Sequence, residues 1–181
     1  MKKNTVYAFI DSQNLYIAIK QLGWELDFER FRKYLTHKYK VQKAFLFIGY
    51  LKSNIKLYTL LEKYGYLIIF KPTLGTKDNV VKGNCDAELV LHSLIEKDNY
   101  QKAIIISGDG DFYCLLDYLL SQNKLFKIGI PSRKSYSSLL RKFRQYFFYV
   151  SDLTSKVSKH RISNKAESGS ELAPSPFALP S

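Results

Sequence analysis

The chain has 181 residues, 46% of them hydrophobic and 24% charged, which excludes disorder throughout and predicts one domain with a packed core. Its formal net charge of +12 favours a polyanionic partner, either nucleic acid or an anionic membrane surface. No apolar run approaches the roughly 18 residues of a membrane span, and the first apolar run is too short for a signal peptide, so we expect a cytoplasmic protein without a membrane anchor.

Apolar runs rich in β-branched and aromatic residues alternate along the chain with stretches of helical periodicity. Strands are expected at 5–10, 41–50, 66–70, 103–107, 125–130 and 146–150. Helices are expected at 13–22, 27–38, 54–64, 84–97, 111–122 and about 135–144. Several strands are continuously apolar, as in strands that helices cover on both faces. The pattern therefore predicts an α/β fold, a Rossmann-like three-layer α/β/α sandwich with a mainly parallel central sheet.

The apolar periodicity stops near the C-terminus, where serine, proline and small residues replace it. We therefore expect a folded domain over residues 1–162 and a disordered tail over residues 163–181. Within the domain, Asp27 is a candidate N-cap and Gly65 is expected to close a helix.

Carboxylates follow two of the predicted strands. Asp11 ends the first strand, and Asp109 and Asp111 follow the fourth in "IIISGDGD". In an open parallel sheet, ligands bind beyond the carboxyl ends of the strands, so these acids converge if the two strands are neighbours. Asp86 is a fourth candidate, because it opens a helix whose predicted buried face consists of Ala87, Val90, Leu91, Leu94 and Ile95.

Carboxylates that lie this close together repel one another unless a cation is present. Mg²⁺ or Mn²⁺ prefers oxygen ligands and is commonly held by a few carboxylates together with a substrate phosphate. Each acid also has a purely structural interpretation, as a turn residue, an N-cap or a residue that favours a helix N-terminus.

Polar, basic and aromatic residues surround these acids in the sequence. Asn14 follows Asp11 by three residues, so its amide is a candidate for positioning a water or a phosphate oxygen. The candidates for RNA binding are Lys71, Lys77, Lys82, Arg133, Lys134 and Tyr136. Tyr136 is predicted to stack on an unpaired base, whereas a solvated charged face and a core aromatic are the alternatives for this set.

Three segments of the chain form a recognisable set: "FIDSQNLY" (9–16), "KGNCDAELVLHSL" (82–94) and "IIISGDGDFYCLLDYL" (104–119). Together they resemble the NYN domain, a branch of the PIN-like nuclease superfamily, in its LabA-like form. The resemblance implies a PIN-like fold and metal-dependent RNA cleavage. It implies metal binding by Asp11, Asp86, Asp109 and Asp111, with Asn14 and Ser107 in support. Ser12 stands where the family often has glycine. We expect Ser12 and Ser107 to lie next to the metal-binding carboxylates.

The sequence thus predicts a Mg²⁺- or Mn²⁺-dependent ribonuclease that acts on single-stranded or structured RNA. A non-catalytic RNA-binding module of the same fold is the alternative. A nucleotide-binding or phosphohydrolase protein is a weaker one, because the sequence has neither a GxxxxGK[ST] loop nor a GxGxxG fingerprint. A homo-oligomer is left open, and the sequence does not distinguish endonucleolytic from exonucleolytic cleavage.

Overall fold

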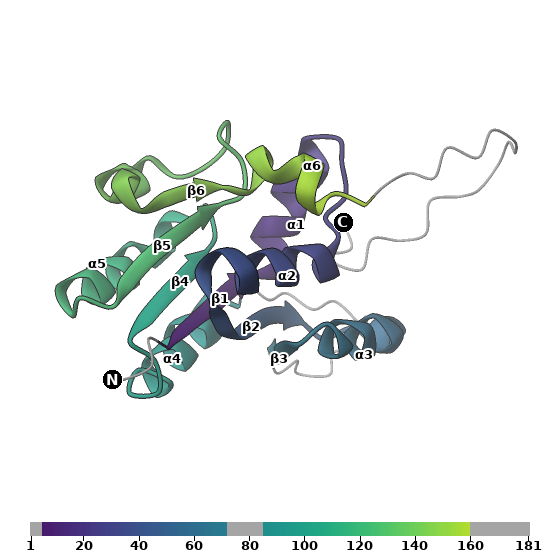
Figure 1. Ribbon diagram of the computed structural model, residues 1–181, viewed down its shortest axis with the longest axis horizontal. Coiled ribbons are helices and arrows are strands. Elements are labelled where there is room, and N and C mark those ends of the chain that lie inside the picture. Colours follow the sequence, from purple (N-terminus) through teal and green to yellow (C-terminus); the bar gives the residue numbers. More distant parts are fainter. Residues whose placement is uncertain (1–4, 72–84, 160–181) are drawn as a thin grey trace, which may run out of the picture.

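A computed structural model describes residues 5–71 and 85–159 of the chain. Its sheet has six parallel strands in the order β3-β2-β1-β4-β5-β6. The strands are β1 (Val6–Asp11), β2 (Val41–Gly49), β3 (Tyr66–Lys71), β4 (Lys102–Ile106), β5 (Leu125–Ile130) and β6 (Phe147–Tyr149). The predicted parallel α/β/α sandwich is confirmed (Figure 1).

Helices connect the strands. The α-helices are α1 (Ser12–Gln21), α2 (Phe28–Tyr39), α3 (Ile55–Lys63), α4 (Asp86–Ile95), α5 (Tyr113–Ser121) and α6 (Thr154–Val157). The described residues also form four 3₁₀ segments: η1 (Lys52–Asn54), η2 (Gly110–Phe112), η3 (Ser138–Tyr146) and η4 (Val150–Leu153). Asp27 caps α2 by accepting the backbone N–H of Arg30, and Gly65 follows α3 with a left-handed φ of +88°, as both were predicted. Across the described part of the chain, no helix combines the length and the apolar character that crossing a membrane requires.

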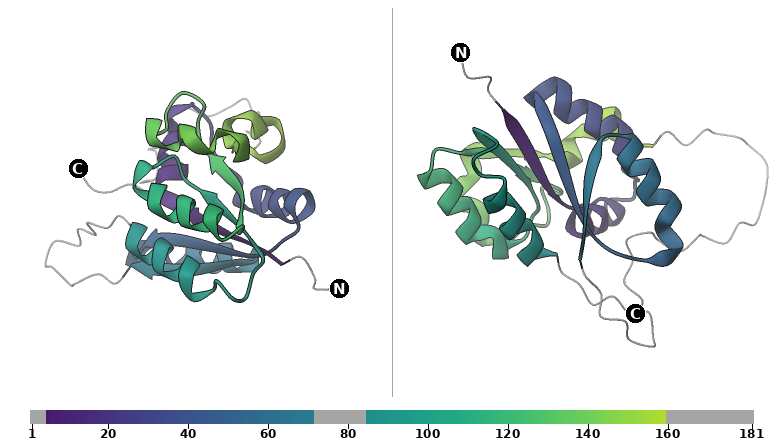
Figure 2. Two further views of the ribbon diagram at one scale, coloured as in Figure 1. Left: turned by 90° about the vertical axis from the view of Figure 1, so that its left-hand side faces the viewer. Right: turned by 90° about the horizontal axis from the view of Figure 1, so that it is seen from below.

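Alternate side chains of the central strands pack into two separate hydrophobic cores, one on each face of the sheet. Val6, Ala8 and Ile10 of β1 face one core, which includes residues of α1, α2, α3 and α6. Tyr7 and Phe9 face the other, which includes residues of α4, α5 and η3. The right-hand view of Figure 2 shows α4 and α5 on one side of the strands and α2 and α3 on the other. Because both faces are covered, the strands read as continuous apolar runs.

The strand order places a switch point between β1 and β4. From β1 the chain builds the sheet outward through β2 and β3, and it then returns to add β4, β5 and β6 on the other side. β1 and β4 are direct neighbours, with Ile10 paired to Ile106. The loops that leave their carboxyl ends diverge at this point, which is where open α/β sheets bind ligands.

Helix α4 buries a different face from the predicted one. Leu91, Leu94 and Ile95 are 57%, 40% and 61% exposed, whereas Leu89 and Ser93 are buried. Asp86 lies three residues before Leu89 and seven before Ser93, so it shares the inward-facing stripe of the helix. Of the five residues of the predicted core face, Val90 packs against the core and the other four are exposed. The side of α4 that meets the sheet is the narrower stripe that begins at Asp86.

The helix predicted at about 135–144 was also wrong in type and start. Residues 138–146 form a 3₁₀ segment, and Leu140 and Phe143, three residues apart, are its buried side chains. In a 3₁₀ helix, residues three apart lie on one face. The preceding residues are held elsewhere, because the N–H of Ser137 donates to the carbonyl of Gly108 at 2.9 Å.

Candidate active site

The predicted acidic residues lie on three elements at the switch point. Asp11 is the last residue of β1 and the N-cap of α1, and Asp109 and Asp111 lie just beyond β4. Asp86 is the first residue of α4, and this helix contacts β1. The neighbouring carboxyl ends that the sequence argument required are therefore present.

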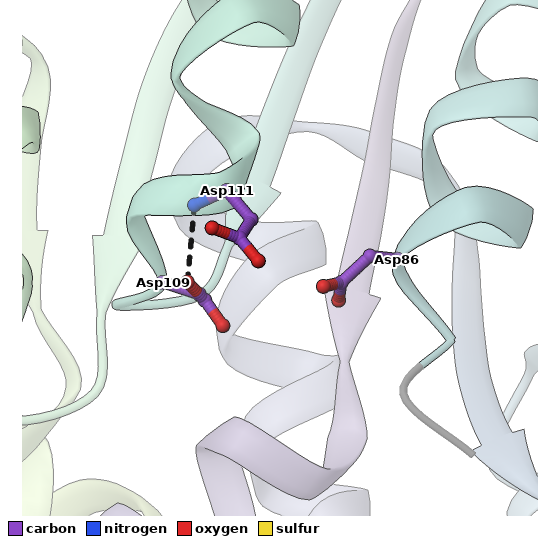
Figure 3. A group of neighbouring side chains, drawn as sticks. All are labelled: Asp86, Asp109 and Asp111. Carbon is purple, nitrogen blue, oxygen red and sulfur yellow. Dashed lines mark hydrogen bonds between the residues drawn. The ribbon is translucent and has the colours of Figure 1, made fainter.

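Three of the acids converge closely enough to share a cation. One carboxylate oxygen from each of Asp86, Asp109 and Asp111 lies within 4.8 Å of the other two. Figure 3 shows the three carboxylates directed toward a common space between the loop after β4 and the start of α4. Such an oxygen-only donor set suits Mg²⁺ or Mn²⁺ rather than zinc, which more often has nitrogen or sulfur ligands.

Asp109 also has a structural role. Its Oδ1 accepts the backbone N–H of Asp111 at 3.0 Å and so caps the 3₁₀ turn that carries Asp111 (Figure 3). The cap interpretation and the ligand interpretation of this residue are thus compatible. The hydrogen bond fixes the orientation of the Asp109 carboxylate, while Asp111 remains exposed and Asp86 and Asp109 are half-buried.

Asp11 lies beside this group rather than within it. It is 8% exposed, its Oδ1 accepts the N–H of Asn14 at 3.1 Å, and its Oδ2 accepts the hydroxyl of Ser107 at 3.1 Å. Burial raises the pKa of Asp11, these two hydrogen bonds oppose the rise, and the negative charge of Asp109 adds to it. Of the four acids predicted to meet, the structure brings three within ligand distance, because the Asp11 side chain is turned toward its own cap.

Ser107 links Asp11 to the group of three. Its hydroxyl donates to Asp11 and accepts the N–H of Asp109 at 3.1 Å, and the side chain is buried. Ser12, the other serine predicted near the ligands, is directed elsewhere, because its hydroxyl donates to the carbonyl of Phe47 on β2. Ser107 is therefore the serine that couples the two acidic strand ends.

Asn14 orients the loop that carries Asp109. Its Oδ1 accepts the N–H of Gly108 at 2.8 Å, which ties the start of α1 to the loop after β4. The predicted role was to position a water or a phosphate oxygen. The contact that the structure shows is instead to the backbone next to Asp109.

The two glycines of "SGDGD" permit close packing against the segment after β5. A Cβ at Gly108 would lie 3.3 Å from the Cβ of Tyr136. A Cβ at Gly110 would lie 2.9 Å from the Cβ of Ser137 and still closer to its hydroxyl oxygen. Because side-chain carbon atoms do not approach this closely, glycine is required at residue 110 for the two segments to meet as they do.

A pocket of about 550 Å³ lies where these two segments meet. One side is formed by Asn14 and the loop from Gly108 to Asp111. The other side is formed by residues of the segment after β5, namely Lys134, Ser135, Tyr136, Ser137 and Leu139. Sequence reasoning missed Ser135, Ser137 and Leu139. The available signal was their place in the run that contains Lys134 and Tyr136.

The predicted basic residues divide into three groups. Lys134 lines the pocket, and Lys71 ends β3, where its charge acts on Cys85 next to Asp86. Arg133 is instead held by Asp152, with Nη2 2.6 Å from Oδ2, and lies over the ring of Tyr149. Lys77 and Lys82 lie outside the described residues.

Glu88 is a further acidic residue near this edge that the sequence analysis did not single out. Its Oε2 is buried and has no hydrogen-bond partner among the residues that the structure describes. Burial, followed by the charge of Glu88 and that of Asp11, raises the pKa of Cys85 to about 12. The start of α4 is therefore a place where negative charge accumulates with little solvent.

Comparison with known proteins places the chain in a family. The family model of the NYN domain matches residues 5–154. The crystal structure of a protein of unknown function from Vibrio parahaemolyticus has the same fold, with a TM-score of 0.70 and 21% identity over 87% of this chain and 97% of that chain. The comparison with curated proteins gives no match. The chain belongs to the NYN domain family, a nuclease-like family of the PIN-like superfamily.

Proposed function

We propose that this protein is a metal-dependent ribonuclease that hydrolyses RNA phosphodiester bonds at the acidic group. The observation that carries the proposal is the convergence of Asp86, Asp109 and Asp111 within 4.8 Å at the switch point of the sheet. Three carboxylates at this distance favour the binding of a divalent cation, because the cation relieves their mutual repulsion.

The roles of the residues follow from their contacts. Asp86, Asp109 and Asp111 would hold Mg²⁺ or Mn²⁺, which supplies an activated water and stabilises negative charge on the phosphate. Asp11 is a positioning residue that acts through Ser107. The Ser107 hydroxyl donates to Asp11 and accepts the N–H of Asp109, so Asp11 helps to orient the loop that carries Asp109. Asn14 is a positioning residue, since it holds the backbone of Gly108.

The charge of the molecule supports RNA as the substrate. The net charge of +12 favours a polyanion, and Lys134 and Lys71 lie on either side of the acidic group in the order of the strands. Lys77 and Lys82, which lie outside the described residues, are proposed as further phosphate contacts. Arg133 is not proposed as a phosphate contact, because Asp152 pairs with it.

The test is an RNA digestion with increasing Mn²⁺ or Mg²⁺, comparing the parent protein with Asp109→Asn and Asp117→Asn. Asp117 is the control, because it pairs with Lys142 on the outside of α5 and does not line the pocket. We expect cleavage by the parent and by Asp117→Asn, no cleavage after chelation, and at least a hundredfold loss in Asp109→Asn, typical of lost electrostatic stabilisation.

Undiminished cleavage by Asp109→Asn would refute the proposed active site. If the parent binds RNA but never cleaves it, and if binding ignores both divalent ions and Asp11→Asn, the alternative of a non-catalytic RNA-binding module is favoured instead.

A further inference from the structure

The pocket beside the acidic group has two chemically different sides. Asp109 and Asp111 form part of one side, and Lys134 and Tyr136 form part of the other. Its volume of about 550 Å³ is within the range of pockets that hold one small ligand. The pocket lining therefore suits a nucleotide beside the metal site. The ring of Tyr136 matches a base, the ammonium group of Lys134 matches a phosphate, and Asp109 and Asp111 match a cation that binds the phosphodiester to be cleaved.

The side that carries Lys134 and Tyr136 is held in place by backbone contacts. The Lys134 N–H donates to the hydroxyl of Ser132 at 3.1 Å, and Ser132 is buried. The Ser137 N–H donates to the carbonyl of Gly108 at 2.9 Å. The backbone is thus held at Lys134 and at Ser137, on either side of Tyr136. The pocket is therefore formed before a ligand binds.

The Tyr136 ring is supported by two other rings. Phe147 meets it edge to face at 5.6 Å between ring centroids, and Tyr149 lies at 6.5 Å. Tyr136 itself is half-buried and still lines the pocket. A ring that is supported in this way offers a base a stacking surface at a low entropic cost, and stacking of this kind tolerates any base sequence.

The two basic residues of this turn differ in what they contact. Arg133 is engaged by Asp152 and Tyr149. Lys134 makes no ion pair with any residue in the described ranges, and it lines the pocket. Lys134 is therefore the cation available to a phosphate here, and Arg133 is a matched control on the neighbouring residue.

We infer that this pocket holds one unpaired nucleotide of the RNA strand, next to the phosphodiester at the acidic group, with its base against Tyr136 and its phosphate near Lys134. The inference rests on the proposed function and narrows its substrate class. Stacking on an aromatic side chain is the usual way in which proteins bind unpaired bases, so we expect single-stranded RNA or a loop to bind better than a continuous duplex.

The test measures binding of a short fluorescent RNA by anisotropy in EDTA, so that the result does not depend on cleavage. We expect Tyr136→Ala to weaken binding roughly 5- to 100-fold and Tyr136→Phe to retain it, since the ring supplies the stacking. Lys134→Ala is expected to lower the slope of log affinity against log salt by about 0.7, the value for one phosphate contact with a single strand. Tyr118→Ala and Arg133→Ala, which alter residues outside the pocket, should bind as the parent does.

Two RNA ligands complete the test. A duplex of the same sequence should bind at least tenfold more weakly than the single strand. A strand that is abasic at every position should bind the parent more weakly than the intact strand, and this loss should be much smaller in Tyr136→Ala. Equal affinity of the parent for single strand and duplex, or for the intact and the abasic strand, would overturn the inference. A parent that binds the abasic strand more weakly but does not cleave RNA would refute the proposed function and leave the pocket assignment intact.

Discussion

Replacing Asp109 by asparagine separates the charge of this residue from its structural role. The Asp109 Oδ1 caps η2 by accepting the N–H of Asp111 at 3.0 Å, and the side-chain oxygen of asparagine accepts the same bond. The substitution therefore removes one negative charge from the group of three and keeps the cap. We expect Asp109→Asn to stabilise the metal-free protein, although it removes activity.

The magnitude follows from the geometry. Two unit charges 4.8 Å apart, the upper limit of the separations here, repel by about 1 kcal/mol in bulk water and by about 3 kcal/mol at an effective dielectric constant of 20. Because Asp111 is exposed and Asp86 is half-buried, the value for water applies, and the two repulsions that Asp109 experiences sum to about 2 kcal/mol. At 2–4 °C per kcal/mol for a chain of this length, the melting temperature rises by about 4–8 °C.

The assay is thermal unfolding in EDTA and again with increasing Mn²⁺. In EDTA, Asp109→Asn should melt above the parent. With Mn²⁺, the parent should gain stability by mass action, about 2.7 kcal/mol at a hundred times the dissociation constant, and the variant should gain much less. The control, Asp117→Asn, loses an exposed ion pair with Lys142, so its melting temperature should be equal to or slightly below that of the parent. If Asp109→Asn melts below the parent in EDTA and responds to Mn²⁺ as the parent does, the three acids are not a repulsive cation site.

Gly110→Ala should destabilise the protein by about 1–3 kcal/mol through overpacking against Ser137, and Gly110→Ala combined with Ser137→Gly should recover part of the loss in chemical denaturation. The pKa of Asp11 is raised by burial, so the stability that its neutral form confers is lost as pH rises through that pKa. The advantage of Asp11→Asn over the metal-free parent should therefore grow between pH 4 and pH 7 in thermal melts. Iodoacetamide at pH 8 should modify exposed Cys114 and leave Cys85, whose pKa is about 12, largely unmodified; equal labelling, followed by mass spectrometry, would contradict the buried environment of Cys85.

The class of fold was predictable because both faces of the sheet are covered. Helices on both sides bury the central strands on two faces, and this leaves nearly continuous apolar runs in the sequence, as in β1 and β4. The order of the strands has no comparable signal, since the residues that pair β1 with β4 are ordinary aliphatic side chains. The expected convergence of Asp11 with Asp109 therefore depended on the assumption that β1 and β4 are neighbours. The structure confirms this assumption, but it leaves Asp11 outside the group of three acids.

Asp86 was placed correctly for a reason that was partly wrong. The sequence argument took Leu91, Leu94 and Ile95 as the buried face of α4, and these residues are exposed. Apolar residues cover more than one side of this helix, so the pattern does not specify which side meets the sheet. The helix turns Leu89 and Ser93 inward, and Asp86 heads that stripe. The residue reaches the acidic group because of this rotation.

The sequence does not show which of the basic residues are paired with acidic ones. Arg133 and Lys134 are adjacent and equally basic in the sequence, but Asp152 neutralises only the first. The partner is 19 residues away and lies beyond β6, so no local pattern reveals it. Ser137 and Leu139 were missed in the same way, because they belong to a segment that was assigned to a helix and instead packs against the "SGDGD" loop.

The positive and negative charges of the pocket remain available because they do not neutralise one another. Lys134 lines the same pocket as Asp109 and Asp111, yet no ion pair joins it to either acid in the structure that residues 5–71 and 85–159 form. The carboxylates therefore favour a divalent cation, and the ammonium group favours a phosphate. A phosphate oxygen also binds the cation, so the bound cation favours the phosphate and the bound phosphate favours the cation. By linkage, the cation and the RNA each raise the affinity of the protein for the other by the same factor. A chain of net charge +12 thus gains from an acidic pocket, since the acids recruit the ion that joins the RNA to the site.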